Sequence, residues 1–460
     1  MAIFSRRVLQ YMINENAKIL SKDQLDKHIC DLNNADEKSL GFEWEVALIY
    51  GFSQIGKVVH APNLKGTSKV DLYFTLNLES GQSFIADITT VSDRGYEAEN
   101  PQAAFTKELL KIIRKYKLQP NSFSVEIGGE SEGPYRNRKM KLKLPAKGQL
   151  KNILDEKFYD FMRTIAKKPS SRCSHFIETD SAEVVIEYNP ERRDGFSLNF
   201  PAYNVAYSLE KNPIYNALKD KANQLKKASY GGPVAIILCD GGCRLFKDRG
   251  IRGLNYNARD IIQHFLSKNS SISFVLTFYI ERSNNWFKPL GDPHLKIQLY
   301  PNSVENIGKD LLDCMNKLNQ VLPKPVNDAG NALNRLKSLK HNVGLSFYGG
   351  MKMTNNTISI SARALHELLA GRVSQKKFLE DHRLIPTQTH PDDKNFFELR
   401  LQEGRMIEEI EVERSKIEDD DWLIIKFRKP DPSISPFKPP SYYWLLKIKQ
   451  KLRSFLLSRY

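Results

Sequence analysis

The chain has 460 residues, of which 41% are hydrophobic and 27% are charged. This length allows about two to four domains, and the composition excludes a wholly disordered chain. Lysine and arginine number 69 against 54 aspartates and glutamates, a formal net charge of +15. A positive surplus attracts polyanions over long range, but many soluble proteins carry a generic basic surface, so the charge indicates a nucleic-acid partner only together with a suitable site.

Two features bear on the compartment of the protein. No uninterrupted apolar run reaches the ~18 residues that a membrane-spanning helix needs, and the first twenty residues lack the order of a secretory signal. We therefore expect no transmembrane segment and a cytoplasmic protein. The five cysteines are scattered, and CDGGC at 239–243 has no second pair with zinc-ligand spacing. These cysteines are expected to be reduced and without a metal.

The first 130 residues read as helices followed by short strands. Apolar spacing predicts a helical lead-in at 1–33, and the nearly all-apolar stretch SLGFEWEVALIYGF at 39–52 predicts a buried helix. Strands are expected at 57–61, 69–78 and 83–91, and the last two form a hairpin through a turn at 79–82. A helix at 101–117 and a strand at 122–127 follow.

The rest of the chain changes character several times. A basic Gly- and Pro-containing stretch at 128–151 reads as an exposed insertion, with strands expected at 183–188 and 195–201. A clear helix–strand unit follows at 212–242, and another strand at 272–280. Beyond residue 301 the pattern is mostly helical (304–322, 361–369 and 374–381), with a short αβ module at 395–428. Residues 441–460 form a basic amphipathic helix in this prediction.

These elements predict an α/β (α+β) fold with a mixed central sheet flanked by helices. The expected organisation is a helical lead-in at 1–38, a core at 39–300 with an insertion at about 128–205, and a C-terminal accessory region at 301–460. Either of two αβ pairs could complete the core sheet after the hairpin, the pair at 101–127 or the pair at 212–242. The sequence leaves both open.

Two aspartates on the predicted hairpin carry the chemistry. In KVDLYF, Asp71 alternates with apolar residues, and in FIADITT, Asp87 shares a strand face with Thr89, Ile85 and Val91. Aspartate is disfavoured inside strands, so one on each of two adjacent apolar strands indicates a function. Neighbouring strands lie ~5 Å apart, which lets both carboxylates bind one hard cation such as Mg²⁺ or Mn²⁺.

The helix before the hairpin offers a third acid. Glu45 falls on the apolar line of Phe42, Ile49 and Phe52, where an ionised carboxylate is costly unless it meets a cation or hydrogen-bond donors. Glu43 is the competing residue on a different face of the same helix. We favour Glu45 as the third acid of this site.

A helix with Glu, then strands that carry Asp and a second acid two residues before a Lys, resembles the PD-(D/E)XK (restriction-endonuclease-like) nuclease superfamily. The stretches that carry the resemblance are GFEWEVALIYGFSQIG, KVDLYF and FIADITT, between Gly41 and Val91. The resemblance implies a metal-dependent nuclease with Asp71, Asp87 and the carbonyl of Ile88 as metal ligands and Glu45 as a further catalytic acid.

This chain departs from that pattern at Thr89, which stands where the family has lysine. A threonine cannot supply the positive charge, so the lysine must come from elsewhere or the core has lost catalysis. Lys221 is the first candidate, on a helix with Gln224 one turn further on. Lys69 is the second.

Two basic segments extend this prediction to partners. The first segment has closely spaced basic residues that could contact a phosphate backbone. They are Arg136, Arg138, Lys139, Lys141 and Lys143. The amphipathic C-terminal helix leaves a protein partner open, and homo-oligomers are equally open. The predicted function is a Mg²⁺-dependent endonuclease, acting on DNA in preference to RNA, of the kind found in prokaryotic restriction or anti-phage defence. The alternative is a catalytically inactive nuclease-like fold that binds nucleic acid or a protein partner.

Overall fold

The computed structural model describes most of the chain, and everything below concerns that part. The described residues are 3–33, 38–62, 64, 70–76, 83–97, 99–134, 138–192, 196–247, 255–282, 292–303, 309–333, 351–354, 356–386, 393–414 and 421–434. Contacts divide the chain into two compact units, Met1–Leu345 with Lys416–Asp419, and Ser346–Ser415 with Asp420–Tyr460. The first unit therefore runs past the boundary expected near residue 300. The predicted C-terminal helix at 441–460 and the hairpin turn at 79–82 lie outside the described residues.

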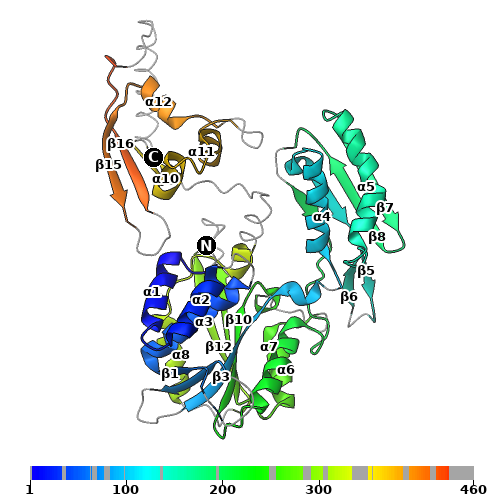
Figure 1. Cartoon of the computed structure of the whole chain (residues 1–460), viewed down its shortest axis with the longest axis vertical. Coiled ribbons are helices and arrows are strands. Elements are labelled where there is room, and N and C mark those ends of the chain that lie inside the picture. Colours follow the sequence, from blue (N-terminus) through cyan, green and yellow to red (C-terminus); the bar gives the residue numbers. More distant parts are fainter. Residues whose placement is uncertain are drawn as a thin grey trace, which may run out of the picture. The chain divides into compact units, whose positions relative to one another are not determined.

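The centre of the first unit is a six-stranded mixed sheet (Figure 1). Its order is β1-β2-β3-β10-β11-β12, in which β3 runs parallel to β10 and β10 runs parallel to β11, while the other neighbours are antiparallel. The strands are Gly56–His60, Leu72–Leu76, Ser83–Val91, Val234–Asp240, Phe274–Arg282 and Pro293–Pro301. The predicted α/β (α+β) fold class is thereby confirmed.

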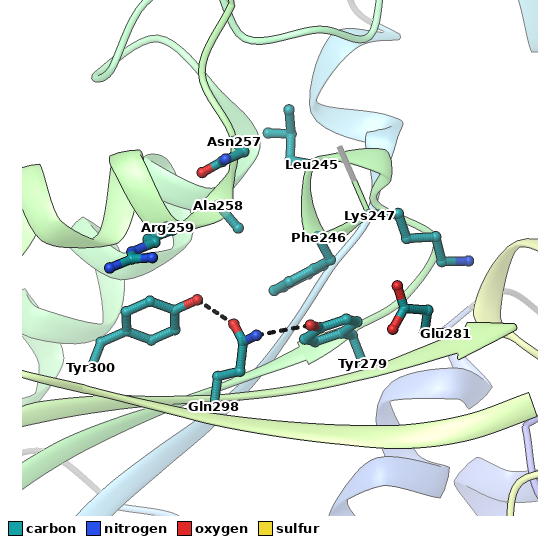
Figure 2. A pocket seen from close by; sticks show the side chains of 10 residues that line it. All are labelled: Leu245, Phe246, Lys247, Asn257, Ala258, Arg259, Tyr279, Glu281, Gln298 and Tyr300. Carbon is teal, nitrogen blue, oxygen red and sulfur yellow. Dashed lines mark hydrogen bonds between the residues drawn. The ribbon is translucent and has the colours of Figure 1, made fainter. Parts of the chain in front are cut away.

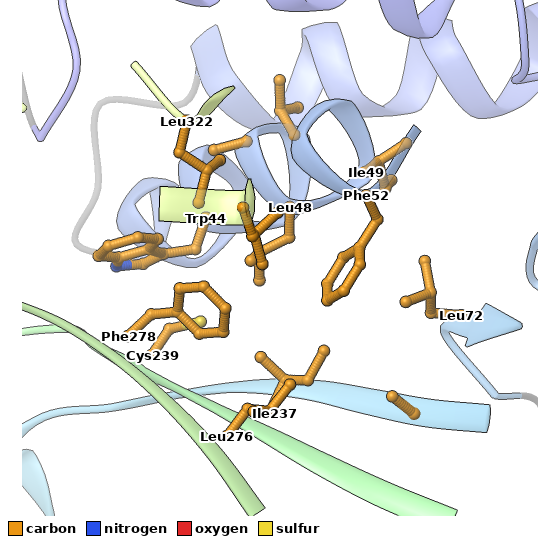
Figure 3. Close-up of a cluster of buried hydrophobic side chains, with 14 of the residues drawn as sticks. Trp44, Leu48, Ile49, Phe52, Leu72, Ile237, Cys239, Leu276, Phe278 and Leu322 are labelled. Carbon is orange, nitrogen blue, oxygen red and sulfur yellow. The ribbon is translucent and has the colours of Figure 1, made fainter. Parts of the chain in front are cut away.

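One face of this sheet is covered by the helix that the sequence predicts to be buried, α3 (Ser39–Ile55). Trp44, Leu48 and Phe52 point from α3 onto side chains of the central strands, including Ile237 and Phe278 (Figure 3). The outer side of α3 contacts α1 (Arg6–Asn16), α2 (Lys22–Asn33) and α8 (Lys309–Val321). Because α3 lies between a sheet and a helical layer, it needs apolar residues nearly all round. Contact with α8 is what carries the first unit beyond residue 300.

Two helices cover the opposite face of the sheet. α6 (Pro213–Lys226) and α7 (Ala258–Lys268) bury a second apolar cluster against the strands, in which Ile85 and Val91 of β3 take part. The side chains of β3 alternate between the two faces of the sheet as predicted, since Phe84 and Ala86 belong to the apolar cluster on the α3 side. Val70 and Leu72 should share one face of the sheet if the alternation extended to both. Instead, Val70 lies in the apolar cluster on the α6 side and Leu72 in the cluster on the α3 side. β2 begins at Leu72, so the strand alternation does not extend back to Val70.

The segment between β3 and α6 forms a lobe with a core of its own. Its four-stranded sheet has the order β7-β8-β4-β9 and packs against two helices. The strands are Cys173–Thr179, Ala182–Tyr188, Phe123–Ile127 and Ser197–Asn199, and the helices are α4 (Gln102–Lys115) and α5 (Leu150–Lys167). A hairpin of β5 (Gly129–Glu132) and β6 (Lys139–Leu142) completes the lobe.

This lobe settles which αβ pair completes the central sheet. β4 belongs to the lobe, whereas β10 pairs directly with β3, so the pair at 212–242 extends the hairpin and the pair at 101–127 does not. The insertion expected at 128–205 therefore begins earlier, because α4 and β4 are already part of it.

The second unit is a smaller α+β body. Its sheet has the order β13-β14-β16-β15, and α10 and α11 contribute to its apolar cluster. The strands are Met351–Met353, Thr357–Ser361, Trp422–Phe427 and Ile407–Glu413, and the helices are α10 (Ala362–Leu369), α11 (Gln375–Asp381) and α12 (Phe396–Gln402). No helix in the described parts of either unit is both long and apolar enough to cross a membrane.

Candidate metal centre

Asp71 and Asp87 meet at the open end of the β2–β3 hairpin. The backbone N–H of Asp71 donates to Asp87 Oδ1 at 3.1 Å, and the backbone N–H of Ile88 donates to Asp71 Oδ2 at 2.8 Å. β2 begins one residue after Asp71. The side chain of Asp71 thus accepts a backbone hydrogen bond just beyond the end of the β2–β3 ladder. This exchange fixes both carboxylates relative to the backbone.

A lysine of α6 reaches the two aspartates. Lys221 Nζ lies 3.6 Å from Asp71 Oδ2 and 3.6 Å from Asp87 Oδ2. Its ammonium also donates to Gln224 Oε1 at 3.3 Å, one turn further along the helix. Asp87 and Thr89 point toward the α6 layer because they share a strand face with Ile85 and Val91. The structure therefore brings together Asp71 from the residue before β2, Asp87 from β3, and Lys221 and Gln224 from α6.

The two carboxylates are in different surroundings. The Asp87 side chain is fully buried and that of Asp71 is 31% exposed. Burial, followed by the negative charge of Asp71, raises the pKa of Asp87 to about 6, against the opposing effect of Lys221. Burial also raises the pKa of Asp71, and Lys221 again opposes the shift. A bound cation would reduce the repulsion between these two buried carboxylates.

The residues present fit a hard divalent cation. Carboxylate oxygens are the donors that Mg²⁺ and Mn²⁺ select. Asp87 Oδ2 is buried and has no hydrogen-bond partner among the described residues, so it keeps an oxygen available for a ligand bond. When both aspartates are ionised, the single ammonium of Lys221 leaves a net negative charge. Asp71 and Asp87 are therefore the residues that would hold the cation.

Glu45 faces a pair of histidines. His60 Nε2 lies 3.1 Å and His28 Nε2 lies 3.5 Å from the same carboxylate oxygen, Glu45 Oε1. Burial would raise the pKa of Glu45, but the hydrogen bond with His60 and the charges of both histidines leave that pKa lowered. Burial lowers the pKa of His28. The charge of Glu45 also raises the pKa of Asp71. The backbone N–H of Ala61, directly after His60, donates to the carbonyl oxygen of Asp71 at 3.0 Å, so the histidine cluster borders the aspartate pair.

Sequence reasoning missed both histidines. His28 lies on α2 among the partly buried Leu25, Ile29 and Leu32, and His60 ends β1. A histidine within an apolar helical stripe was a local signal for His28. Nothing in the sequence indicates that His28 and His60 meet.

Glu43, the competitor of Glu45, has a structural position. Its buried carboxylate accepts hydrogen bonds from the backbone N–H groups of Ile3 at 2.9 Å and Phe4 at 3.2 Å. It thereby ties the N-terminal segment to α3. This places the Glu43 carboxylate on the helical side of α3, while Glu45 faces β1 through His60.

Three other predicted site residues have distinct outcomes. Ile88 contributes its N–H to Asp71, and the metal-ligand role of its carbonyl stays a prediction. Thr89 is half-buried and lies next to Leu238 of β10 in register. Lys69 lies outside the described residues.

The basic segment of the lobe is partly neutralised by its own neighbours. Lys139 is ion-paired with Glu99, Lys141 lies 3.3 Å from Glu132, and Lys143 lies 2.7 Å from Glu183. Arg138 immediately precedes β6, and Arg136 lies outside the described residues. A phosphate backbone would have to compete with these carboxylates for the three lysines.

A separate cavity of about 270 Å³ opens between α7 and the sheet (Figure 2). Tyr300 donates to the Gln298 carboxamide at 2.5 Å, and that carboxamide donates to Tyr279 at 3.0 Å. The remaining lining residues are Leu245, Phe246, Lys247, Asn257, Ala258, Arg259 and Glu281. One carboxylate is present in this lining, so the cavity has no acidic pair of the kind that the hairpin offers.

Comparisons of the chain with models of protein families, with curated proteins and with solved structures find no match. The metal-binding role of Asp71 and Asp87 is therefore argued from the positions of their side chains alone.

Proposed function

We propose that this protein is a metal-dependent endonuclease whose catalytic centre is formed by Asp71, Asp87 and Lys221. The observation that carries the proposal is the position of the Lys221 ammonium, 3.6 Å from a carboxylate oxygen of each aspartate. Phosphodiester hydrolysis needs carboxylates for a divalent cation and a positive charge for the developing anion. The three residues supply both.

Each residue has a distinct task in this proposal. Asp71 and Asp87 would hold the cation, which when bound supplies a Lewis acid at the phosphate. Lys221 stabilises the negative charge that develops on the phosphate and its leaving oxygen. Gln224 holds the ammonium of Lys221 in place through the 3.3 Å hydrogen bond. Thr89 stands where the family pattern has a lysine, and its uncharged side chain has no such task in this proposal.

The order of elements supports the assignment to the PD-(D/E)XK superfamily. A glutamate-bearing helix precedes an antiparallel run of strands with the two aspartates, and a helix with lysine then leads to a strand parallel to β3. In this proposal the lysine has moved from β3 to α6. A net charge of +15 favours a nucleic-acid substrate, with DNA as our first choice. A cytoplasmic role in restriction or anti-phage defence is the corresponding biological proposal.

The test is cleavage of plasmid DNA, single-stranded DNA and RNA by the full-length protein with Mg²⁺, Mn²⁺ or EDTA. We expect metal-dependent cleavage, reduced at least about a hundredfold in Asp87→Asn. The matched control is Asp220→Asn, an exposed aspartate on α6, which should cleave normally. Absence of cleavage with either metal, or full activity in Asp87→Asn, would overturn the proposal. Metal-independent DNA binding without cleavage would favour the inactive binding fold instead.

A further inference from the structure

His28, Glu45 and His60 direct three potential ligand atoms to one place. The atoms are the two imidazole Nε2 nitrogens and a Glu45 oxygen, and all lie within 4.8 Å of one another. The imidazole rings stand edge to face with their centres 5.3 Å apart. The three residues come from α2, α3 and β1, so two helices and a strand hold them.

The distances suit a tetrahedral cation. Zinc bonds to histidine nitrogen and carboxylate oxygen are ~2.0–2.1 Å, so two ligands of one tetrahedral ion lie about 3.3 Å apart. The two separations to Glu45 Oε1 are 3.1 and 3.5 Å. The separation between the two nitrogens is at most 4.8 Å. Glu45 Oε1 therefore lies from each imidazole nitrogen at the spacing of two ligands that share a tetrahedral ion.

In each histidine, burial leaves the Nε2 nitrogen as the atom that can bind a metal. Both Nδ1 atoms are enclosed and have no hydrogen-bond partner in the described part of the chain. Both Nε2 atoms face Glu45. A cation that binds either imidazole would therefore bind at the Nε2 atom, where the carboxylate charge attracts it.

We propose that His28, Glu45 and His60 form a binding site for a transition-metal dication of the Zn²⁺ class, distinct from the Asp71 and Asp87 centre. Two imidazoles and one carboxylate select Zn²⁺ or Co²⁺ over Mg²⁺, which prefers oxygen ligands. Three protein ligands leave a fourth position open for water or substrate. This site exists whether or not the aspartate pair cleaves nucleic acid.

The site borders the aspartate pair through the backbone. Ala61, directly after His60, donates its N–H to the carbonyl oxygen of Asp71 at 3.0 Å. A cation at the histidines would place positive charge beside Asp71.

The experiment uses the full-length Asp71→Asn/Asp87→Asn protein, in which the aspartate pair is neutral. After EDTA treatment and removal of the chelator, it is titrated with Co²⁺ in millimolar Mg²⁺, and bound Zn²⁺ is measured separately. We expect one Co²⁺ per chain with the visible absorption of a tetrahedral ion. His28→Gln or His60→Gln should weaken binding at least about a hundredfold, more than loss of an outer partner of a ligand.

The matched control is His264→Gln. His264 pairs with Glu210 at 3.0 Å and belongs to no cluster of three metal-ligating side chains among the described residues, so its loss should leave Co²⁺ binding unchanged. X-ray absorption of the Zn²⁺-loaded double variant tests the ligands without further mutation and should show two imidazoles. No bound metal, or metal retained in both His→Gln variants, overturns the proposal. Cleavage of nucleic acid is not part of the readout, so failure of the nuclease proposal leaves this result intact.

Discussion

Lys221 and Asp87 face each other between α6 and the central sheet, with Lys221 Nζ 3.6 Å from Asp87 Oδ2. Asp87 lies on β3 and Lys221 on α6, and the whole lobe from α4 to β9 stands between them in the sequence. The lobe has its own core, and β3 and β10 pair directly. A large insertion can therefore stand between the two residues without moving them apart.

Replacing Lys221 should separate binding from cleavage. In Lys221→Met, we expect metal-dependent cleavage to fall at least about a hundredfold, because the charge that stabilises the transition state is lost. DNA affinity should change little, since one partly buried lysine adds little to the long-range field. The measurement pairs single-turnover cleavage with DNA binding in Ca²⁺. Lys219→Met, which removes an exposed lysine of the same helix, is the control, and an equal loss in both variants contradicts the assignment.

Metal binding at the hairpin should appear as thermal stabilisation. A ligand at about 100 times its Kd stabilises the folded state by about 2.7 kcal/mol, so Mg²⁺ should raise the Tm of the wild type. Asp87→Asn should lose this response. The pKa of Asp87 is raised to about 6, so its ionised form costs stability above that pH. At pH 8 in EDTA the variant should therefore be at least as stable as the wild type. A preserved Mg²⁺ response would exclude Asp87 as a ligand.

Asp240 should make folding less favourable as the pH rises from 4 to 6. Burial raises its pKa to about 6, although Lys247 and the N–H groups of Gly242 and Cys243 oppose the shift. The folded protein holds a proton that the unfolded chain releases near pH 4. The cost is thus absent below pH 4 and complete above pH 6, at about 3 kcal/mol at most.

Asp240→Asn tests this dependence because an amide oxygen can still accept from Gly242 and Cys243. The free energy of unfolding of the variant relative to the wild type should increase between pH 4 and pH 7. Urea denaturation followed by circular dichroism measures it, with the exposed Asp220→Asn as a flat reference. A constant difference across this range would mean that Asp240 does not titrate there.

Glu43 should matter for stability and not for catalysis. Glu43→Ala leaves the buried N–H groups of Ile3 and Phe4 without the carboxylate, which should cost about 1–3 kcal/mol. Glu43→Gln keeps an acceptor oxygen and should cost less. Denaturant unfolding gives these values, and cleavage per folded molecule should stay the same. Loss of cleavage with unchanged stability would return Glu43 to the list of catalytic acids.

The lysines of the β5–β6 region should contact nucleic acid more strongly once their carboxylate partners are removed. A triple variant Glu99→Gln, Glu132→Gln and Glu183→Gln frees the lysines described above. DNA affinity should increase, and the slope of log K against log salt should steepen by up to about 3. Binding titrations at several salt concentrations measure the slope. An unchanged slope would show that the three lysines do not meet phosphates.

The local pattern of the sequence was sufficient for several features. The two-residue alternation predicts the antiparallel β2–β3 pair and the strand face of Asp87, because strand faces and a short connection are local properties. It is wrong in placing Asp71 inside a strand, since β2 begins at Leu72. The apolar character of α3 predicts its burial for the same reason. The pattern also marked Lys221 and Gln224 as neighbours on one helix.

Only the tertiary structure decided the rest. The choice of β10 over β4 as the neighbour of β3 depends on pairing between distant segments. The same non-local packing carries Lys221 to the aspartates and gives Glu45 its two histidines. No local propensity encodes such meetings, because they are made by layers that pack only after each element has formed.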